Sequence, residues 1–272
     1  MDKIYQDVIH IKTKCKNKLG TILFIHGFTS SNMLHFYFQE NFNANLGYDY
    51  LAINLPGHQF HNNSNNIKNY DFHKYIDYIY GYIIDENLNN LILIGHSMGG
   101  GIAMFLSEKI KERINKIILV SAINSSIFKS KVGISFLNSV NNNNSKGIEK
   151  LEFFKYYNEF NKNDENSTIN EYIKYEIQRF FNNKKRYMHL GAQLLDPILY
   201  FKLDKIYKKN KIPTLFMIGK YDKVVPYTPT IKYLRQLKNS HLTIKTIDNA
   251  SHVSFIDNFK EYDEYLWWFI NR

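Results

Sequence analysis

One serine in this sequence stands in a setting that could make it a nucleophile. Ser97 lies in Gly95-His96-Ser97-Met98-Gly99, which fits the pattern G-x-S-x-G and follows an apolar run that resembles a buried strand. Glycines two positions to either side allow a sharp turn from strand to helix, and the helix N-terminus would add oriented N–H groups beside a developing oxyanion. The pattern indicates nucleophilic catalysis by Ser97. The alternative is a glycine turn that carries an incidental serine.

A serine hydroxyl is a weak nucleophile and needs a base together with an acid that orients the base. His252 follows a strand-like segment that ends near Ile247, and Asp222 follows one that ends near Gly219. Both residues therefore lie past the C-terminal ends of predicted parallel strands, at the edge of the sheet where α/β sites assemble. We expect His252 to accept the serine proton and Asp222 to fix the tautomer of the imidazole.

Three other aspartates could orient His252. Asp248 ends the preceding strand and Asp257 follows the histidine closely in the chain, so both are more typical of surface or capping positions. Asp196 precedes a proline inside a helical region, which is typical of a turn residue. Asp222 is therefore the preferred acid.

The elements that must position these residues can be inferred from the hydropathy pattern. Strand-like apolar runs at 21–27, 48–57, 91–96 and 114–122 alternate with stretches that have apolar residues at helical spacing. This rhythm favours a mostly parallel α/β sheet with helices on both faces. It stops near residue 121 and returns with the runs at 212–219 and 241–248. We predict a core of residues 1–120 and 212–272 and a helical insertion at 121–211.

Composition excludes several classes of function. The 272 residues carry a net charge of +10, but the lysines are scattered and form no dense basic patch, so no nucleic-acid partner is expected. Cys15 is the single cysteine, which excludes an intrachain disulfide and favours a reducing compartment. No run approaches the roughly 18 apolar residues of a membrane span, and the N-terminus lacks a signal-peptide core. We expect a soluble cytoplasmic protein.

The histidines suggest no metal site. His58, His61 and His73 lack metal-ligand spacing, and we expect neither a metal nor another cofactor. His26 and His96 flank the serine motif and its partner loop, where we expect them to hydrogen-bond the backbone rather than carry protons.

Three motifs together resemble the α/β-hydrolase superfamily, in its branch of serine esterases and monoacylglycerol lipases, over nearly the whole chain. The segment GHSMGG at 95–100 is similar to the nucleophile elbow, GKYDKVVP at 219–226 to the acid turn, and HGF at 26–28 to the oxyanion segment. The resemblance implies that the backbone N–H groups of Phe28 and Met98 form the oxyanion hole. It also implies that the insertion roofs the active site as a cap.

The loop after the run at 48–57 departs from the family pattern. Many relatives carry an acidic residue and a G-x-G-x-S turn here, where this chain has Asn54 and Gln59. The structure of this loop and any substrate contact there are left open. Aromatic residues of the insertion could either line an apolar pocket or pack the insertion onto the sheet; they are Phe153, Phe154, Tyr156, Tyr157, Phe180 and Phe181.

The resemblance implies hydrolysis of a carboxylic ester with an apolar acyl group, such as a monoacylglycerol or lysophospholipid, through an acyl-enzyme. A serine nucleophile argues against the dehalogenase and epoxide-hydrolase branches, and Met98 replaces the tryptophan usual in proline iminopeptidases. A peptidase or amidase, a C–C hydrolase and a non-catalytic ligand-binding homologue stay open. The expected partner is a small-molecule ester; transient contact with a membrane surface and the oligomeric state are also open.

Overall fold

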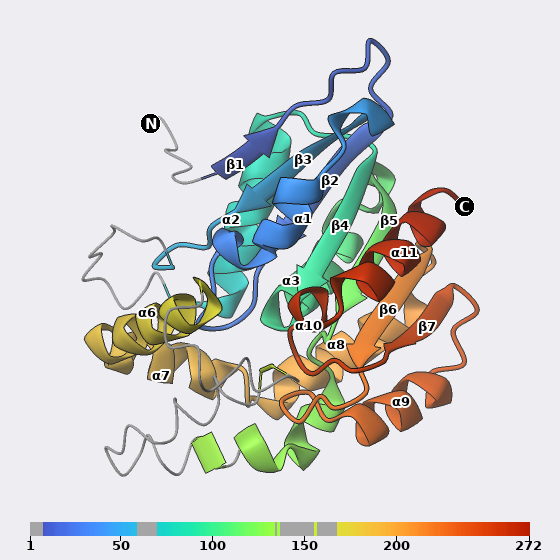
Figure 1. Ribbon diagram of the computed structural model, residues 1–272. Coiled ribbons are helices and arrows are strands. Elements are labelled where there is room, and N and C mark those ends of the chain that lie inside the picture. Colours follow the sequence, from blue (N-terminus) through green and yellow to red (C-terminus); the bar gives the residue numbers. More distant parts are fainter. Residues whose placement is uncertain (1–7, 59–69, 134, 137–154, 157–167) are drawn as a thin grey trace.

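The computed structural model describes residues 8–58, 70–133, 135–136, 155–156 and 168–272 (Figure 1). These residues build a seven-stranded sheet in the order β1-β3-β2-β4-β5-β6-β7, parallel throughout except for β1. The strands are β1 (Val8–Ile11), β2 (Gly20–Ile25), β3 (Tyr48–Ile53), β4 (Leu91–His96), β5 (Ile114–Val120), β6 (Thr214–Gly219) and β7 (Leu242–Ile247). The predicted mostly parallel α/β sheet is confirmed.

Helices cover both faces of this sheet. One face carries α2 (Phe72–Asp85), α3 (Met98–Lys109), α8 (Pro197–Lys209) and α9 (Tyr227–Gln236), and the other carries α1 (Phe36–Asn41), α10 (Ser254–Asp257) and α11 (Phe259–Ile270). The remaining elements are α6 (Thr168–Asn182), α7 (Lys184–Gln193) and the short 3-10 turns η1 (Asn32–His35), η2 (Ala44–Leu46), η4 (Lys111–Arg113) and η5 (Ser125–Lys129).

The two-residue period of the strands divides the core between these two helical layers. On β2, Leu23 and Ile25 pack in the cluster that includes α2, α3 and α8, while Ile22 and Phe24 pack in the cluster that includes α1 and α11. All four side chains are fully buried. Burial on both faces explains why the central strands form unbroken apolar runs in the sequence.

One strand escapes prediction from the sequence. The edge strand β1 pairs antiparallel with β3 over four residues, with Val8 opposite Ile53 and Ile11 opposite Tyr50. Its side chains are only partly buried or exposed, so the sequence lacks the continuous apolar run that marks the central strands.

The helices α6, α7 and α8 lie between β5 and β6, the interval from which the sequence pattern predicts no strand. In Figure 1, α6 and α7 lie at the end of the sheet toward which the parallel strands point, whereas α8 packs against α3. Among the described helices, none has the length and hydropathy needed to cross a bilayer.

Candidate active site

Ser97 occupies a sharp turn between β4 and α3. Its backbone has φ 54° and ψ −117°, in the left-handed half of φ/ψ space that side chains other than glycine seldom adopt. The serine N–H donates to the carbonyl of Val120 at 2.9 Å, which ties the turn to β5. A Cβ on Gly95 would lie 2.6 Å from the Cα of Gly100, and one on Gly99 would lie 2.1 Å from the carbonyl oxygen of Ile25. The glycines of the motif are therefore required by close backbone approach.

His252 and Asp222 form a buried pair beyond the ends of β7 and β6. The Nδ1–H of His252 donates to Oδ2 of Asp222 at 2.9 Å, and the exposed fractions of the two residues are 2% and 3%. The other carboxylate oxygen of Asp222 accepts the N–H groups of Val224 and Val225, each at 2.9 Å. This arrangement keeps the proton on Nδ1 and leaves Nε2 as the basic nitrogen.

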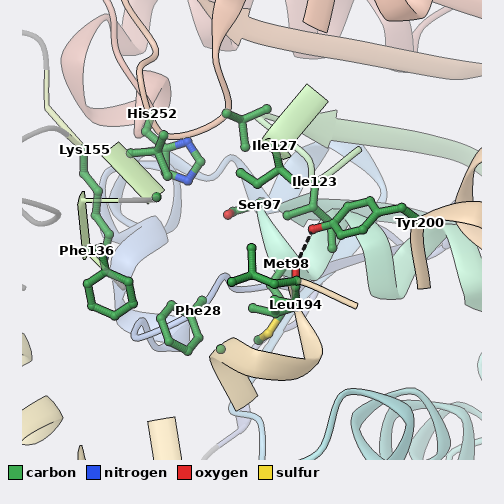
Figure 2. A pocket seen from close by; sticks show the side chains of 15 residues that line it. Phe28, Ser97, Met98, Ile123, Ile127, Phe136, Lys155, Leu194, Tyr200 and His252 are labelled. Atoms are coloured by element: carbon green, nitrogen blue, oxygen red, sulfur yellow. Dashed lines mark hydrogen bonds between the residues drawn. The ribbon is translucent and has the colours of Figure 1, made fainter. Parts of the chain in front are cut away.

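Ser97 and His252 line the same cavity, and Figure 2 shows both side chains among those that surround it. Within the described residues, no hydrogen bond joins the hydroxyl of Ser97 to the imidazole of His252. Such bonds commonly tighten only when substrate is bound. The structure thus brings the predicted base, acid and nucleophile to one edge of the sheet.

The three alternative aspartates have other partners. Asp248 forms an ion pair with Lys220 at 3.1 Å, and Asp257 accepts the N–H of Ser251 at 2.7 Å. Asp196 is the N-cap of α8, where its side chain accepts the N–H of Ile198. Among these four described aspartates, Asp222 alone has a hydrogen bond to the imidazole of His252.

Two further histidines support the loops around the turn. Burial lowers the pKa of His26 to about 3, so its ring is neutral at pH 7. Its Nε2 accepts the N–H of Leu55 at 3.1 Å while Nδ1 donates to the carbonyl of Gly27 at 2.9 Å. Burial also lowers the pKa of His96, whose Nε2 donates to the carbonyl of His252 at 3.0 Å. Both rings therefore hold neighbouring loops through hydrogen bonds to backbone groups.

The residues expected to bind an oxyanion lie next to Ser97. Phe28 and Met98 both line the cavity, and a Cβ on Gly27 would lie 3.0 Å from the Cβ of Ser97, so the loop after β2 passes directly over the serine. Met98 is the first residue of α3, where a backbone N–H has no acceptor within its own helix. This geometry leaves the Met98 amide available to a ligand oxygen beside Ser97, and the role of the Phe28 amide stays a prediction.

The cavity is small and mainly apolar, with a volume of about 100 Å³. Lys155 carries the single fixed charge among its lining residues, and the hydroxyl of Tyr200 is occupied by a hydrogen bond of 2.7 Å to the carbonyl of Leu194. The lining consists of Phe28, Ser97, Met98, Ile123, Ile127, Gly133, Phe136, Lys155, Gly191, Leu194, Leu195, Tyr200, Val224, Val225 and His252. An apolar group next to the serine suits this space.

The predicted aromatic residues of the insertion contribute little to this lining. Phe180 is fully buried and stacks on Tyr187 with 5.6 Å between ring centroids, while Phe181 is partly exposed. Tyr156 packs in the core cluster that includes α11. Phe153, Phe154 and Tyr157 lie outside the described residues. For the described members of this set, packing is the main role, and Phe136 is the aromatic residue of the insertion that enters the cavity wall together with Tyr200.

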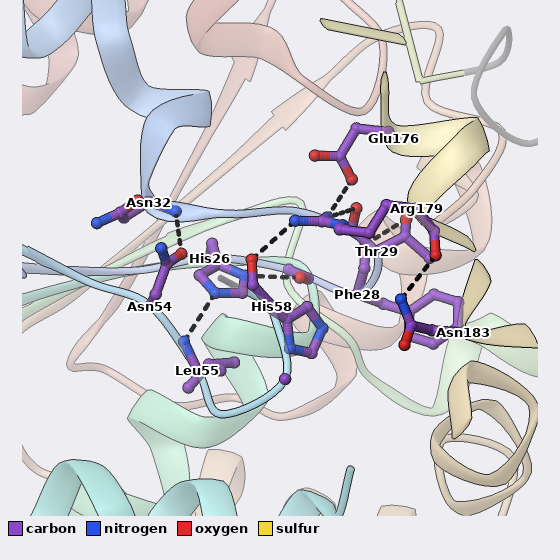
Figure 3. A network of polar contacts seen from close by, with 12 residues as sticks. His26, Phe28, Thr29, Asn32, Asn54, Leu55, His58, Glu176, Arg179 and Asn183 are labelled. Atoms are coloured by element: carbon purple, nitrogen blue, oxygen red, sulfur yellow. Dashed lines mark hydrogen bonds and ion pairs between the residues drawn. The ribbon is translucent and has the colours of Figure 1, made fainter. Parts of the chain in front are cut away.

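Arg179, which forms a buried ion pair within α6, joins this helix to the loops after β2 and β3. Glu176 and Arg179 are almost fully buried and form an ion pair, and the guanidinium also donates to the carbonyl of Thr29 and, at 2.8 Å, to that of His58 (Figure 3). The sequence gives no sign of this pair, because an Arg and a Glu three positions apart are ordinary on an exposed helix. Only their burial makes them notable.

The departure at Asn54 also has a structural consequence. The Asn54 side chain is buried and accepts the N–H of Asn32 at 2.8 Å, so it links the loops after β3 and β2 (Figure 3). Gln59 lies outside the described residues. Within the described ranges, no cluster of three or more His, Cys, Asp or Glu side chains could hold a metal ion.

The family follows from a direct comparison. A model of the alpha/beta hydrolase fold matches residues 20–259, which includes every strand from β2 to β7 and all of the site residues above. The chain belongs to the α/β hydrolase fold family.

The similar proteins agree with this membership. The chain is 27% identical to a Mycoplasma pneumoniae protein named "Putative esterase/lipase 1", covering 94% of this chain and 93% of the relative, and 28% identical to the protein of the same name from Mycoplasma genitalium, covering 89% and 87%. The solved structure of the esterase EaEST from Exiguobacterium antarcticum superposes with a TM-score of 0.76 at 19% identity, over 97% of this chain and 95% of that one. At this low identity, the similarity to the solved structure shows a shared fold.

Proposed function

We propose that this protein is a serine hydrolase that cleaves carboxylic esters with an apolar acyl group, with Ser97, His252 and Asp222 as its catalytic residues. The observation that carries the proposal is the buried His252–Asp222 hydrogen bond beside the cavity that Ser97 enters from its left-handed turn. The family membership and relatives named as esterases or lipases support the same reaction.

In the proposed reaction, Oγ of Ser97 attacks the ester carbonyl while Nε2 of His252 takes the hydroxyl proton. The resulting imidazolium is stabilised by Asp222, and the backbone N–H groups of Phe28 and Met98 bind the oxyanion. Collapse of the tetrahedral intermediate breaks the bond to the alcohol, which leaves with the proton from His252. Water then attacks the acyl-enzyme with the same base, releasing the acid and restoring Ser97.

Replacement of the nucleophile is the first test. Ser97→Ala removes the attacking oxygen without adding volume, and we expect turnover of p-nitrophenyl butyrate to fall by several orders of magnitude. Ser126→Ala offers a matched control, because Ser126 is also buried, but its hydroxyl bonds to Thr230 and it is not among the described residues that line the cavity. Unchanged turnover in Ser97→Ala would remove the proposal. Comparison with aminoacyl-arylamides on the same preparation distinguishes the esterase from a peptidase or amidase.

The volume of the cavity favours short acyl chains. Pockets for drug-sized ligands occupy roughly 300–1,000 Å³, whereas this cavity holds about 100 Å³. We expect butyrate esters to be cleaved with a higher kcat/KM than octanoate esters. A profile that rises with chain length would instead favour the second candidate function, hydrolysis of monoacylglycerols or lysophospholipids.

The outward face of α8 is the specific observation in favour of that second candidate. Ile198 and Phe201 are one turn apart and each is 63% exposed. The ammonium of Lys205 lies 4.0 Å from the ring centroid of Phe201. Further exposed lysines continue the same face; they are Lys202, Lys208 and Lys209. Apolar side chains followed by lysines fit the surface of an anionic bilayer.

Vesicle binding tests this surface directly. We expect sedimentation with phosphatidylglycerol vesicles but not with phosphatidylcholine vesicles, and loss of that binding in the double variant Ile198→Ser/Phe201→Ser. Leu19→Ser is the control, because Leu19 is exposed to a similar degree elsewhere. Equal sedimentation of all three proteins would refute a role for α8 without affecting the esterase proposal.

A further inference from the structure

Thr29 has a strained backbone beside the proposed oxyanion hole. Its φ of 58° places a β-branched residue in the left-handed region, where such residues are genuine outliers. The residue is 1% exposed and directly follows Phe28. Strain of this kind persists only where surrounding contacts impose it, and it concentrates at functional sites.

Phe28 and Thr29 are the middle residues of a turn in which the N–H of Ser30 donates to the carbonyl of Gly27 at 3.3 Å, and side chains from the chain between β5 and β6 reinforce this conformation. Arg179 of α6 donates to the backbone carbonyl of Thr29, and the ammonium of Lys155 donates to the Thr29 hydroxyl at 3.0 Å. That hydroxyl in turn donates to the carbonyl of Phe28 at 2.7 Å. Two cationic side chains thus hold both the main chain and the side chain of the residue next to the oxyanion amide.

The shape and charge of Arg179 suit this task. Its second terminal nitrogen reaches the carbonyl of His58 at 2.8 Å, so one planar guanidinium spans two loops, as Figure 3 shows. Glu176, one turn earlier on α6, balances the buried charge. A guanidinium offers several donors in a fixed plane, which the single ammonium of a lysine cannot reproduce.

We propose that Arg179 is a positioning residue that clamps Thr29 in its left-handed conformation and thereby aims the Phe28 N–H at the oxyanion. The inference rests on the proposed function, since it assigns a task within that reaction. Docking of α6 against the loop after β2 then completes the oxyanion hole. Glycine at position 29 would adopt the same φ without strain and would depend less on the clamp.

The test uses Arg179→Met and the double variant Arg179→Met/Thr29→Gly, assayed with a neutral soluble ester. Removal of an oxyanion donor costs about 100-fold to 1,000-fold in kcat, and misdirection of one should cost about 10-fold or more. We expect kcat to fall by that amount in Arg179→Met with KM unchanged, because the interaction is made in the transition state. The double variant should regain most of the lost kcat.

Arg235→Met is the matched control, because Arg235 is exposed on α9, and its kcat should equal that of the wild type. If Arg179→Met does not fold, Arg179→Lys keeps the charge beside Glu176 and should show the same loss of kcat and the same recovery with Thr29→Gly. An unchanged kcat, or a loss that Thr29→Gly does not restore, would overturn the clamp. Failure of the proposed function would look different, as wild-type hydrolysis that Ser97→Ala leaves intact.

Discussion

Two residues with left-handed backbones lie at the site, and they are held in different ways. Ser97 is constrained by backbone: β4 ends before it, α3 begins after it, and its N–H donates to the carbonyl of Val120 on the neighbouring strand β5. Thr29 lies in a turn closed by the N–H of Ser30 and the carbonyl of Gly27, and it is also held by Arg179 and Lys155, which lie more than a hundred positions away in the chain. The nucleophile therefore depends on backbone contacts of the sheet, whereas the loop that faces it also depends on charged side chains from the chain between β5 and β6.

The same contrast separates two regions of the molecule. Ser97, Asp222 and His252 all follow strands of the sheet, whose core is fully buried on both faces. The polar contacts of Arg179 instead join α6 to loops, through charges that need burial and compensation. We expect substitutions in the first region to abolish chemistry with little loss of stability, and those in the second to affect stability and positioning together.

The largest expected effect lies in the sheet region. Asp222→Asn keeps the size of the side chain but removes the charge that orients His252, and we expect kcat to fall by about 10⁴-fold. The free energy of unfolding in urea should change much less, because the N–H groups of Val224 and Val225 keep an acceptor. Asp248→Asn, at the ion pair with Lys220, is the control. Near wild-type activity in Asp222→Asn would show that catalysis does not depend on the charge of Asp222 in the sheet region.

The next effect belongs to α6. Glu176→Gln leaves the buried charge of Arg179 without its compensating carboxylate, and breaking a buried ion pair costs about 3–5 kcal/mol. Urea denaturation should reveal a destabilisation of that size. Glu171→Gln, on an exposed position of the same helix, should change stability by less than about 0.5 kcal/mol. Equal unfolding free energies for Glu176→Gln and Glu171→Gln would show that the buried ion pair of α6 does not contribute to stability.

The smallest expected effect is a pH dependence of stability that arises from the buried histidine His35 in the core. Burial lowers the pKa of His35 to about 3, and its ring lies between the hydroxyls of Tyr50 at 3.0 Å and Tyr262 at 2.9 Å. The unfolded chain, with an ordinary histidine pKa near 6.5, binds a proton below that pH while the folded chain does not. Stability is therefore expected to fall as pH drops from about 6.5 toward 3, by about 1.4 kcal/mol per pH unit for this group.

The matching variant is His35→Phe, which keeps an aromatic ring between Phe24 and Phe38 but cannot bind a proton. Its unfolding free energy should decline less steeply than that of the wild type between pH 6 and pH 4.5, although loss of two hydrogen bonds should lower its stability at pH 7. Parallel slopes for the two proteins would exclude His35 as a source of the pH dependence.

The sequence reveals much of the sheet region because apolar strand runs and the glycine motif mark it directly. The strand at 91–96 is predicted with its observed bounds, and the turns that carry Asp222 and His252 follow their strands as expected. The edge strand β1 is missed because it is short and only partly buried. The assignment of catalytic roles and the division of the chain at residues 121–211 stay predictions, as does the cytoplasmic location inferred from a single cysteine.

The second region is harder to foresee for a physical reason. Arg179 and Glu176 matter only because tertiary packing removes them from water, and burial of a particular helix face is not encoded in a motif. The strain at Thr29 is equally hidden, since threonine has no preference for a positive φ. A contact between residues 150 positions apart leaves no local pattern in the sequence.

Covalent labelling tests the central claim most directly. A fluorophosphonate probe mimics the tetrahedral intermediate and should attach to Ser97, which peptide mass spectrometry would locate within the segment 95–100, with labelling abolished in Ser97→Ala and slowed in Asp222→Asn. An adduct on a different residue, or ester hydrolysis that persists while Ser97 stays unmodified, would contradict the account.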